Sequence, residues 1–174
     1  LGNDRKSDRL DIGVLKLEGP GLPPYPAVKK CPLPVGALMA NALPREGKQY
    51  LLVGFPESMS RPNPAARDLP SKPFSFRNMS APLSKYTELE VTSQHHIVLS
   101  FDVMHTVMPN TEIRAFPNPS GMSGSPIWFL YDENGSHDPT QTLIVGIAIE
   151  HHKSKRAIVA TDIGIALRLI NEAV

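Results

Sequence analysis

The sequence predicts an all-β fold that ends in an α-helix. Eighteen prolines and twelve glycines among 174 residues are many for a helical protein, and they suit short strands joined by turns. Several β-favouring runs are bounded by Gly, Pro, Asn or Asp, which is typical of strands. Only near the carboxyl end does the apolar spacing change to three and four residues, the period of a helix.

The β-favouring runs predict strands over residues 10–17, 49–56, 73–77, 88–92, 96–101, 111–116, 127–130, 143–150 and 157–161. We expect one helical turn within residues 36–43 and turns at 44–47, 132–135 and 151–156. Residues 22–34 hold five prolines, which excludes a central strand and predicts an extended connector. The polar segment 57–72 predicts a surface loop. Asp162 is placed to cap a helix whose apolar residues are Ile163, Ala166, Leu167, Ile170 and Ala173.

Composition excludes several classes of partner. The net charge of +1 gives no electrostatic reason to expect binding to nucleic acid or to a membrane surface. No apolar run reaches the roughly twenty residues that a transmembrane helix needs. The only cysteine, Cys31, cannot form an internal disulfide, which favours a reducing compartment or a bacterial source. We therefore expect a cytoplasmic bacterial protein.

The most informative stretch is residues 119–130. Ser123 lies between Gly121 and Gly124, and a proline and an apolar β-favouring run follow. Glycine adopts backbone angles that other residues avoid, so a tight turn here can present the Ser123 hydroxyl outward. The N–H groups of Gly121 and Ser123 can then converge on an oxyanion, which makes Ser123 a candidate nucleophile. The alternative is an ordinary Ser/Gly/Pro turn at the start of a strand.

Residues 121–126, Gly-Met-Ser-Gly-Ser-Pro, resemble the Gly-x-Ser-Gly-Gly-Pro nucleophile loop of trypsin-like (chymotrypsin-fold) serine proteases. Residues 11–17, Asp-Ile-Gly-Val-Leu-Lys-Leu, resemble the strand that carries the catalytic aspartate in that family. The two motifs occur in the family's order. The Gly-x-Ser-x-Gly elbow of α/β-hydrolases does not fit, because its fifth position is Ser125 here and a strand rather than a helix follows.

The resemblance implies a trypsin-like double antiparallel β-barrel with a C-terminal α-helix. Residues 1–34 would form the end of the first barrel and the connector, and residues 35–174 the second barrel with the helix. The N-terminus looks truncated, because a half-barrel of sequence precedes the aspartate motif in the family. A preceding segment or a second chain would supply the missing half-barrel.

The resemblance also implies a serine endopeptidase that acts on a protein or peptide substrate without metal or organic cofactor. In its Ser-His-Asp triad Ser123 attacks and Asp11 orients the histidine. In the family one strand lines the substrate cleft, and it corresponds to residues 143–150 here. We therefore expect Ile149, Glu150 and His151, at the end of this strand and just after it, to bind substrate. Asp102 is a competing carboxylate, but it falls after the second barrel has begun.

The general-base histidine is missing from its expected place, because no histidine precedes Asp11. Three explanations are open: the half-barrel that carries it lies upstream of this chain, another chain supplies it, or the protein is an inactive relative. We favour the first. The rival hypotheses are a protease-fold module that binds peptides without cleaving them, and an unrelated β-protein with a chance turn. The histidines present are His95, His96, His105, His137, His151 and His152.

Two further positions depart from the trypsin pattern. Met122 stands where trypsins carry an aspartate that pairs with a newly cut N-terminus, so the nucleophile loop must be ordered in another way. Pro117 stands where the base of the specificity pocket is set, and it offers no carboxylate to attract lysine or arginine. Trypsin-like specificity is therefore not expected.

Overall fold

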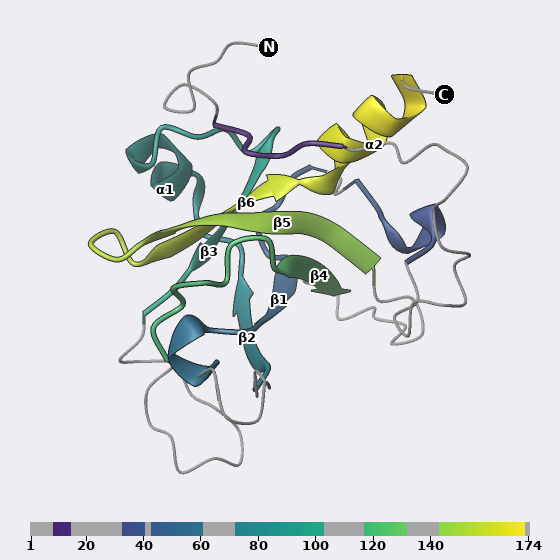
Figure 1. Ribbon diagram of the computed structural model, residues 1–174. Helices are drawn as coiled ribbons and strands as arrows, with labels where there is room; N and C mark the ends of the chain where they lie inside the picture. The colour runs from purple at the N-terminus through teal and green to yellow at the C-terminus, as the bar shows by residue number, and fades with distance from the viewer. Residues whose placement is uncertain are drawn as a thin grey trace, which may run out of the picture.

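The computed structural model describes residues 9–14, 33–40, 43–60, 72–102, 117–131 and 143–172. They form a curled, six-stranded antiparallel sheet with the strand order β2-β1-β4-β5-β6-β3, and a helix follows the last strand (Figure 1). The strands are β1 (Gln49–Gly54), β2 (Phe74–Met79), β3 (His96–Ser100), β4 (Pro126–Tyr131), β5 (Leu143–His152) and β6 (Ala157–Asp162). The prediction of a mostly β fold with a C-terminal helix is confirmed.

The core lies on the inner face of the curled sheet. Along β1, Tyr50 and Leu52 are fully buried while the residues between them are only partly buried, the alternation expected of a strand with one face on the core. Phe76 of β2 and Phe101, just beyond β3, meet edge to face with ring centroids 4.7 Å apart. The two outermost strands therefore contribute to the same core.

The curl also brings the two edge strands toward each other. Ser80, which follows β2, forms an antiparallel bridge with Leu99 of β3. The amide nitrogen Nδ2 of Asn78 donates to the carbonyl oxygen of Ser100 at 2.6 Å. These bonds satisfy backbone groups that an open sheet edge would leave exposed.

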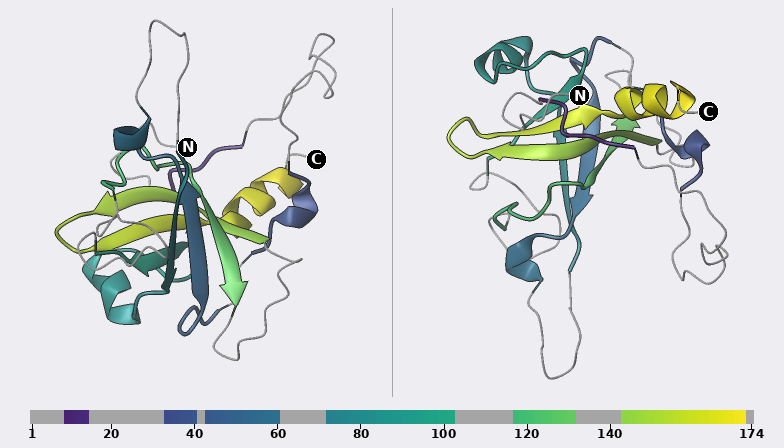
Figure 2. Two further views of the ribbon diagram at one scale, coloured as in Figure 1. Left: turned by 90° about the horizontal axis from the view of Figure 1, so that it is seen from below. Right: turned by 45° about the horizontal axis from the view of Figure 1, so that its top comes forward.

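The C-terminal helix α2 (Ile163–Glu172) begins where the sequence predicts. Asp162 Oδ1 accepts a hydrogen bond from the backbone N–H of Gly164 at 2.7 Å, which caps the helix. Asp162 Oδ2 accepts from Arg45 at 2.7 Å in a buried ion pair. Figure 2 shows α2 beside the 3-10 helix η2 (Val35–Ala37), and a Cβ added to Gly164 would lie 3.0 Å from the Cβ of Ala40.

Two predictions of strands are wrong. Residues 83–88 form the helix α1 (Leu83–Glu88), and the predicted strand at 88–92 is the end and exit of this helix. Tyr86 and Leu89 lie on one face of this segment and are buried, and the Tyr86 hydroxyl accepts from the Val98 N–H at 3.0 Å, so packing on β3 stabilises the helix. Residues 11–14 are not in a strand, because Asp11 has a φ of 41° and interrupts an extended run.

The other predicted elements divide into those described and those outside the described residues. The strands at 49–56, 73–77, 96–101, 127–130, 143–150 and 157–161 are confirmed with shifts of a few residues at their ends. The helical turn within 36–43 is η2, and 57–72 opens with the 3-10 helix η3 (Glu57–Met59). Residues 15–32, 61–71, 103–116 and 132–142 lie outside the described residues, as do the predictions that fall on them. Within the described residues, no helix is both long enough and apolar enough to cross a membrane.

Candidate active site

The predicted Ser123 loop is a tight turn that enters a strand. Gly121 and Gly124 have φ values of 84° and 87°, in the left-handed region that favours glycine. Ser123 between them is exposed, and β4 begins at Pro126. The prediction that this turn leads into a strand is confirmed.

Met122 anchors the loop in the core. Its side chain is 3% exposed and belongs to the main core cluster. A Cβ added to Gly54, the last residue of β1, would lie 2.8 Å from Met122 Cε and would also collide with the Ser125 hydroxyl. Gly54 therefore leaves the space through which both side chains enter. The sequence signal for this contact is a single glycine at the end of a strand run.

Backbone hydrogen bonds tie the loop to its neighbours on both sides. Gly124 N donates to the Ala148 carbonyl of β5 at 2.8 Å, and Ala148 N donates back to Ser125 O at 2.9 Å. On the other side, Glu57 N donates to Ser120 O at 2.9 Å. The Ser123 loop is thereby held between β5 and η3.

Two backbone N–H groups of the Ser123 loop take no part in these hydrogen bonds. Within the described part of the chain, the N–H groups of Gly121 and Ser123 have no acceptor. The neighbouring N–H groups are all used: Ser120 donates to Asn118 Oδ1, Met122 to Pro119 O, Gly124 to Ala148 O and Ser125 to Met122 O. Two available N–H groups that flank a serine hydroxyl in a glycine turn can bind an anion or a developing oxyanion.

A pocket of about 130 Å³ opens beside this turn. The residues predicted to bind substrate, Ile149, Glu150 and His151, line it together with Gly121 and Ser123. The fold therefore brings five of the six predicted site residues around one pocket. The remaining lining residues are Leu52, Pro119, Ser120, Met122, Ala148 and Ile158.

Among the described residues, His151 is the histidine that lines this pocket. Its ring packs edge to face against Phe101, with centroids 5.3 Å apart, and its cross-strand partner is the core residue Ile158. Burial lowers the pKa of His151 from its ordinary value of 6.5, and the charges of His152 and Lys153 lower it further. The ring is therefore neutral at neutral pH.

The Glu150 carboxylate is bound to His152. Its carboxylate Oε2 lies 2.7 Å from His152 Nε2, and its side chain is 54% exposed. Glu150 and His152 are two residues apart on β5, so they share a face that His151 does not. No hydrogen bond joins Ser123 Oγ to a histidine within the described residues, and His105 and His137 lie outside them.

Asp11 lies on the segment 9–14, which the hydrogen bonds of Arg9 and Leu10 attach to β3 and β6. Ser123 precedes β4, which is on the other side of β5 in the strand order. The Asp11 side chain is exposed. Asp102, the competing carboxylate, pairs with Arg156 at 3.1 Å and does not line the Ser123 pocket.

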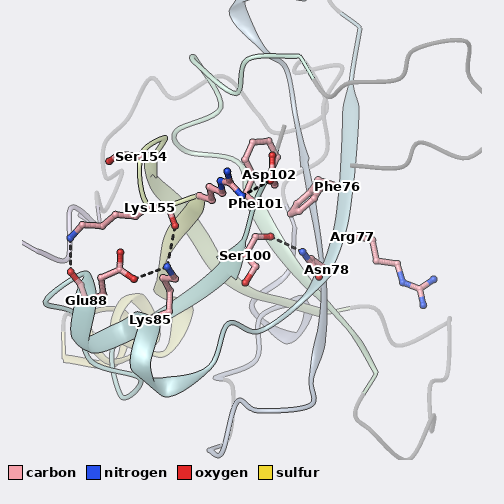
Figure 3. Close-up of a pocket in the computed structure, with 11 residues that line it drawn as sticks. Phe76, Arg77, Asn78, Lys85, Glu88, Ser100, Phe101, Asp102, Ser154 and Lys155 are labelled. Atoms are coloured by element: carbon pink, nitrogen blue, oxygen red, sulfur yellow. Dashed lines mark hydrogen bonds and ion pairs between the residues drawn. The ribbon is translucent and has the colours of Figure 1, made fainter. Parts of the chain in front are cut away.

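A larger hollow of about 690 Å³ lies between β2, α1 and the β5–β6 turn (Figure 3). Four of its charged groups form two ion pairs, Lys85 with Glu88 at 2.6 Å and Arg156 with Asp102 at 3.1 Å. Figure 3 shows the Arg77 side chain pointing away from the other labelled side chains. Internal pairing leaves this hollow without a convergent set of groups for chemistry, so the Ser123 pocket is the better candidate.

Comparison of the chain with known protein families and with curated proteins gives no match. Among the described residues, no group of three or more His, Cys, Asp or Glu side chains is placed to hold a metal ion.

Proposed function

We propose that the protein is a trypsin-like serine endopeptidase and that the curled sheet is the second barrel of a double-barrel fold. The observation that carries the proposal is the Ser123 turn: an exposed serine between two left-handed glycines, two N–H groups without an acceptor among the described residues, and an adjoining pocket. An ordinary turn into a strand needs neither the available donors nor the pocket.

In this proposal Ser123 Oγ attacks the carbonyl carbon of the scissile peptide bond. The negative charge that develops on the carbonyl oxygen is stabilised by the N–H groups of Gly121 and Ser123. A general base must take the hydroxyl proton and return it to the leaving amine, because an unassisted serine hydroxyl is a weak nucleophile. That base is a histidine supplied by a preceding segment or a second chain, and Asp11 orients it.

The pocket favours a substrate with an uncharged side chain next to the scissile bond. Leu52, Met122 and Ile158 make it largely apolar, and His151 adds a neutral ring. Glu150 is engaged by His152, so a lysine or arginine side chain would find no unpaired carboxylate among the described lining residues.

A fluorophosphonate probe tests the nucleophile, because it labels only a serine that a general base has activated. We expect the full-length protein to be labelled at Ser123 and the Ser123→Ala variant to be unlabelled. Ser154→Ala is the control, since Ser154 is an exposed serine in the turn between β5 and β6, does not line this pocket and should leave labelling intact. Labelling of Ser123→Ala at the wild-type level would contradict the assignment.

The second candidate function is a protease-fold module that binds peptides without hydrolysis. The observation that favours it is the missing hydrogen bond between Ser123 Oγ and a histidine within the described residues. A histidine in a small-residue context encoded upstream of Leu1 would favour the protease over the binding module. A binding module would hold peptides in the same pocket and remain unlabelled by the probe.

A further inference from the structure

His96 makes an unusual pair of contacts for a buried histidine. It is 3% exposed, its Nε2 lies 2.8 Å from the carbonyl oxygen of Arg9, and its Nδ1 lies 3.2 Å from the carbonyl oxygen of Thr92. A carbonyl can only accept, so a hydrogen bond to either oxygen takes its hydrogen from the ring, and a neutral ring carries one N–H hydrogen. The bond to Arg9 therefore requires a hydrogen on Nε2, and it joins residues 87 positions apart.

Thr161 holds the next carbonyl of the same segment. It is fully buried in β6, and its hydroxyl donates to the carbonyl oxygen of Leu10. Thr161 is also the cross-strand partner of His96. Two neighbouring side chains on β3 and β6 thus bind two consecutive carbonyls, and the segment 9–14 is fixed along the sheet (Figure 1, purple).

The next residue along the chain is Asp11, whose backbone is strained. Its φ of 41° lies in the left-handed region, which aspartate tolerates better than most residues but still disfavours. Such a conformation persists only where surrounding contacts impose it, and it is concentrated at functional sites. The bonds to Arg9 O and Leu10 O are the contacts that precede this residue directly.

The nearby charges do not explain the fixed segment as well as these bonds do. Arg9 pairs with Glu90 at 3.2 Å, but their side chains are 49% and 76% exposed, so water screens the pair. The buried pair Arg45–Asp162 binds other groups, namely Ser93 O and Gly164 N.

We propose that His96 and Thr161 are positioning residues for Asp11, which they serve by holding the two carbonyls that precede it. This inference rests on the proposed function, in which Asp11 orients the catalytic histidine. A carboxylate that must orient a base needs a fixed backbone, because a displacement of about 1 Å can reduce the rate about a hundredfold.

Matched substitutions separate the two contacts of His96. The glutamine amide nitrogen reaches roughly where Nε2 lies and the asparagine amide nitrogen roughly where Nδ1 lies, so His96→Gln can keep the bond to Arg9 and His96→Asn loses it. In the full-length protein we expect His96→Asn to lower kcat at least about tenfold with KM little changed. His96→Gln should recover most of that loss. Thr161→Val, which has nearly the same shape, should lower kcat while Thr161→Ser should not.

A second measurement reports the segment without any need for catalysis. Trypsin cleaves after arginine, so the cleavage rate of the Arg9–Leu10 bond, followed by mass spectrometry, reports how firmly the two carbonyls are held. We expect faster cleavage in His96→Asn and Thr161→Val than in the wild type. His95→Asn is the control, since the His95 ring meets the His96 ring edge to face with centroids 6.5 Å apart but, within the described residues, forms no hydrogen bond to this segment. The ¹⁵N shifts of the His96 ring should show a hydrogen on Nε2 in the wild type.

The outcomes are distinguishable. An unchanged rate of Arg9–Leu10 cleavage in folded His96→Asn and Thr161→Val would show that these side chains do not hold the segment, and would overturn the inference. Faster cleavage with unchanged kcat would overturn the positioning of Asp11. Wild-type full-length protein that shows no Ser123-dependent hydrolysis would overturn the proposed function itself, and with it the catalytic purpose of the two bonds.

Discussion

At the scale of single residues, the two glycines of the Ser123 turn are required for different reasons. Both have left-handed φ values. A Cβ on Gly121 would lie 3.1 Å from the backbone nitrogen and from the Cβ of Glu57, whereas a Cβ on Gly124 would meet nothing within 4 Å. Glycine is therefore needed at position 124 only for its left-handed φ. At position 121 it is needed both for its left-handed φ and because Glu57 lies too close for a side chain.

This difference gives a paired prediction. Gly124→Ala should lower the free energy of unfolding by about 1–2 kcal/mol, the cost of a left-handed alanine. Gly121→Ala should lower it by about 1 kcal/mol more, because Glu57 must also move. Urea unfolding of the two variants and the wild type measures both values. Equal values for the two variants would show that the contact with Glu57 has no energetic weight.

At the scale of elements, α2 depends on one carboxylate with two partners. Asp162 caps the helix through Oδ1 and pairs with Arg45 through Oδ2, and the Asp162 and Arg45 side chains are 7% and 2% exposed. Arg45 NH1 is buried without a hydrogen-bond partner within the described residues, so this guanidinium depends on the few contacts that it has. A helix cap and a buried ion pair thus join α2 to the segment before β1.

Asp162→Asn isolates the ion pair, because asparagine can still cap the helix. We expect a loss of about 3–5 kcal/mol in the free energy of unfolding, since the Arg45 charge stays buried without its partner. The double variant Arg45→Met with Asp162→Asn should recover most of that loss. The exposed pair Arg9–Glu90 supplies the control: Glu90→Gln should change little. A small effect of Asp162→Asn in thermal and urea unfolding would contradict a stabilising ion pair.

At the scale of the whole molecule, the strand order assembles the candidate site. The Ser123 loop precedes β4, His151 lies on β5 and Phe101 follows β3, yet the curl of the sheet brings these three residues to neighbouring positions. His151 is partly desolvated by this arrangement, which lowers its pKa. In the unfolded chain the His151 ring is exposed to water.

The lowered pKa of His151 predicts a dependence of stability on pH. Between the folded pKa and the ordinary value of 6.5, the unfolded chain binds more protons than the folded protein. The stability that depends on a neutral His151 ring is therefore fully present above pH 6.5. It is lost as the pH falls through the pKa of His151 in the folded protein. We expect the free energy of unfolding to fall on acidification below 6.5 and the slope to be shallower in His151→Gln. An identical slope in the variant would show that His151 is not the titrating group.

Much of the fold could be predicted from local pattern. Alternation along residues 49–54, the turn glycines and the cap at Asp162 act within a few residues, so their sequence signals are direct. The helix α1 could not be predicted in this way, because Tyr86 and Leu89 stabilise it only by packing on β3. The strand predicted at residues 10–17 is absent from residues 10–14, where Asp11 has a left-handed φ and side chains on β3 and β6 bind the carbonyls of Arg9 and Leu10.

The candidate site likewise has local features that the sequence predicts and long-range contacts that it does not. By itself the sequence determined the turn at Ser123, because glycine φ angles and the run that follows are local properties. Only the tertiary structure decided that Met122 enters the core past Gly54, that His96 binds the carbonyl of Arg9, and that no described residue accepts from the N–H groups of Gly121 and Ser123. These contacts join residues far apart in the chain, and their existence depends on how the strands are ordered in the curled sheet.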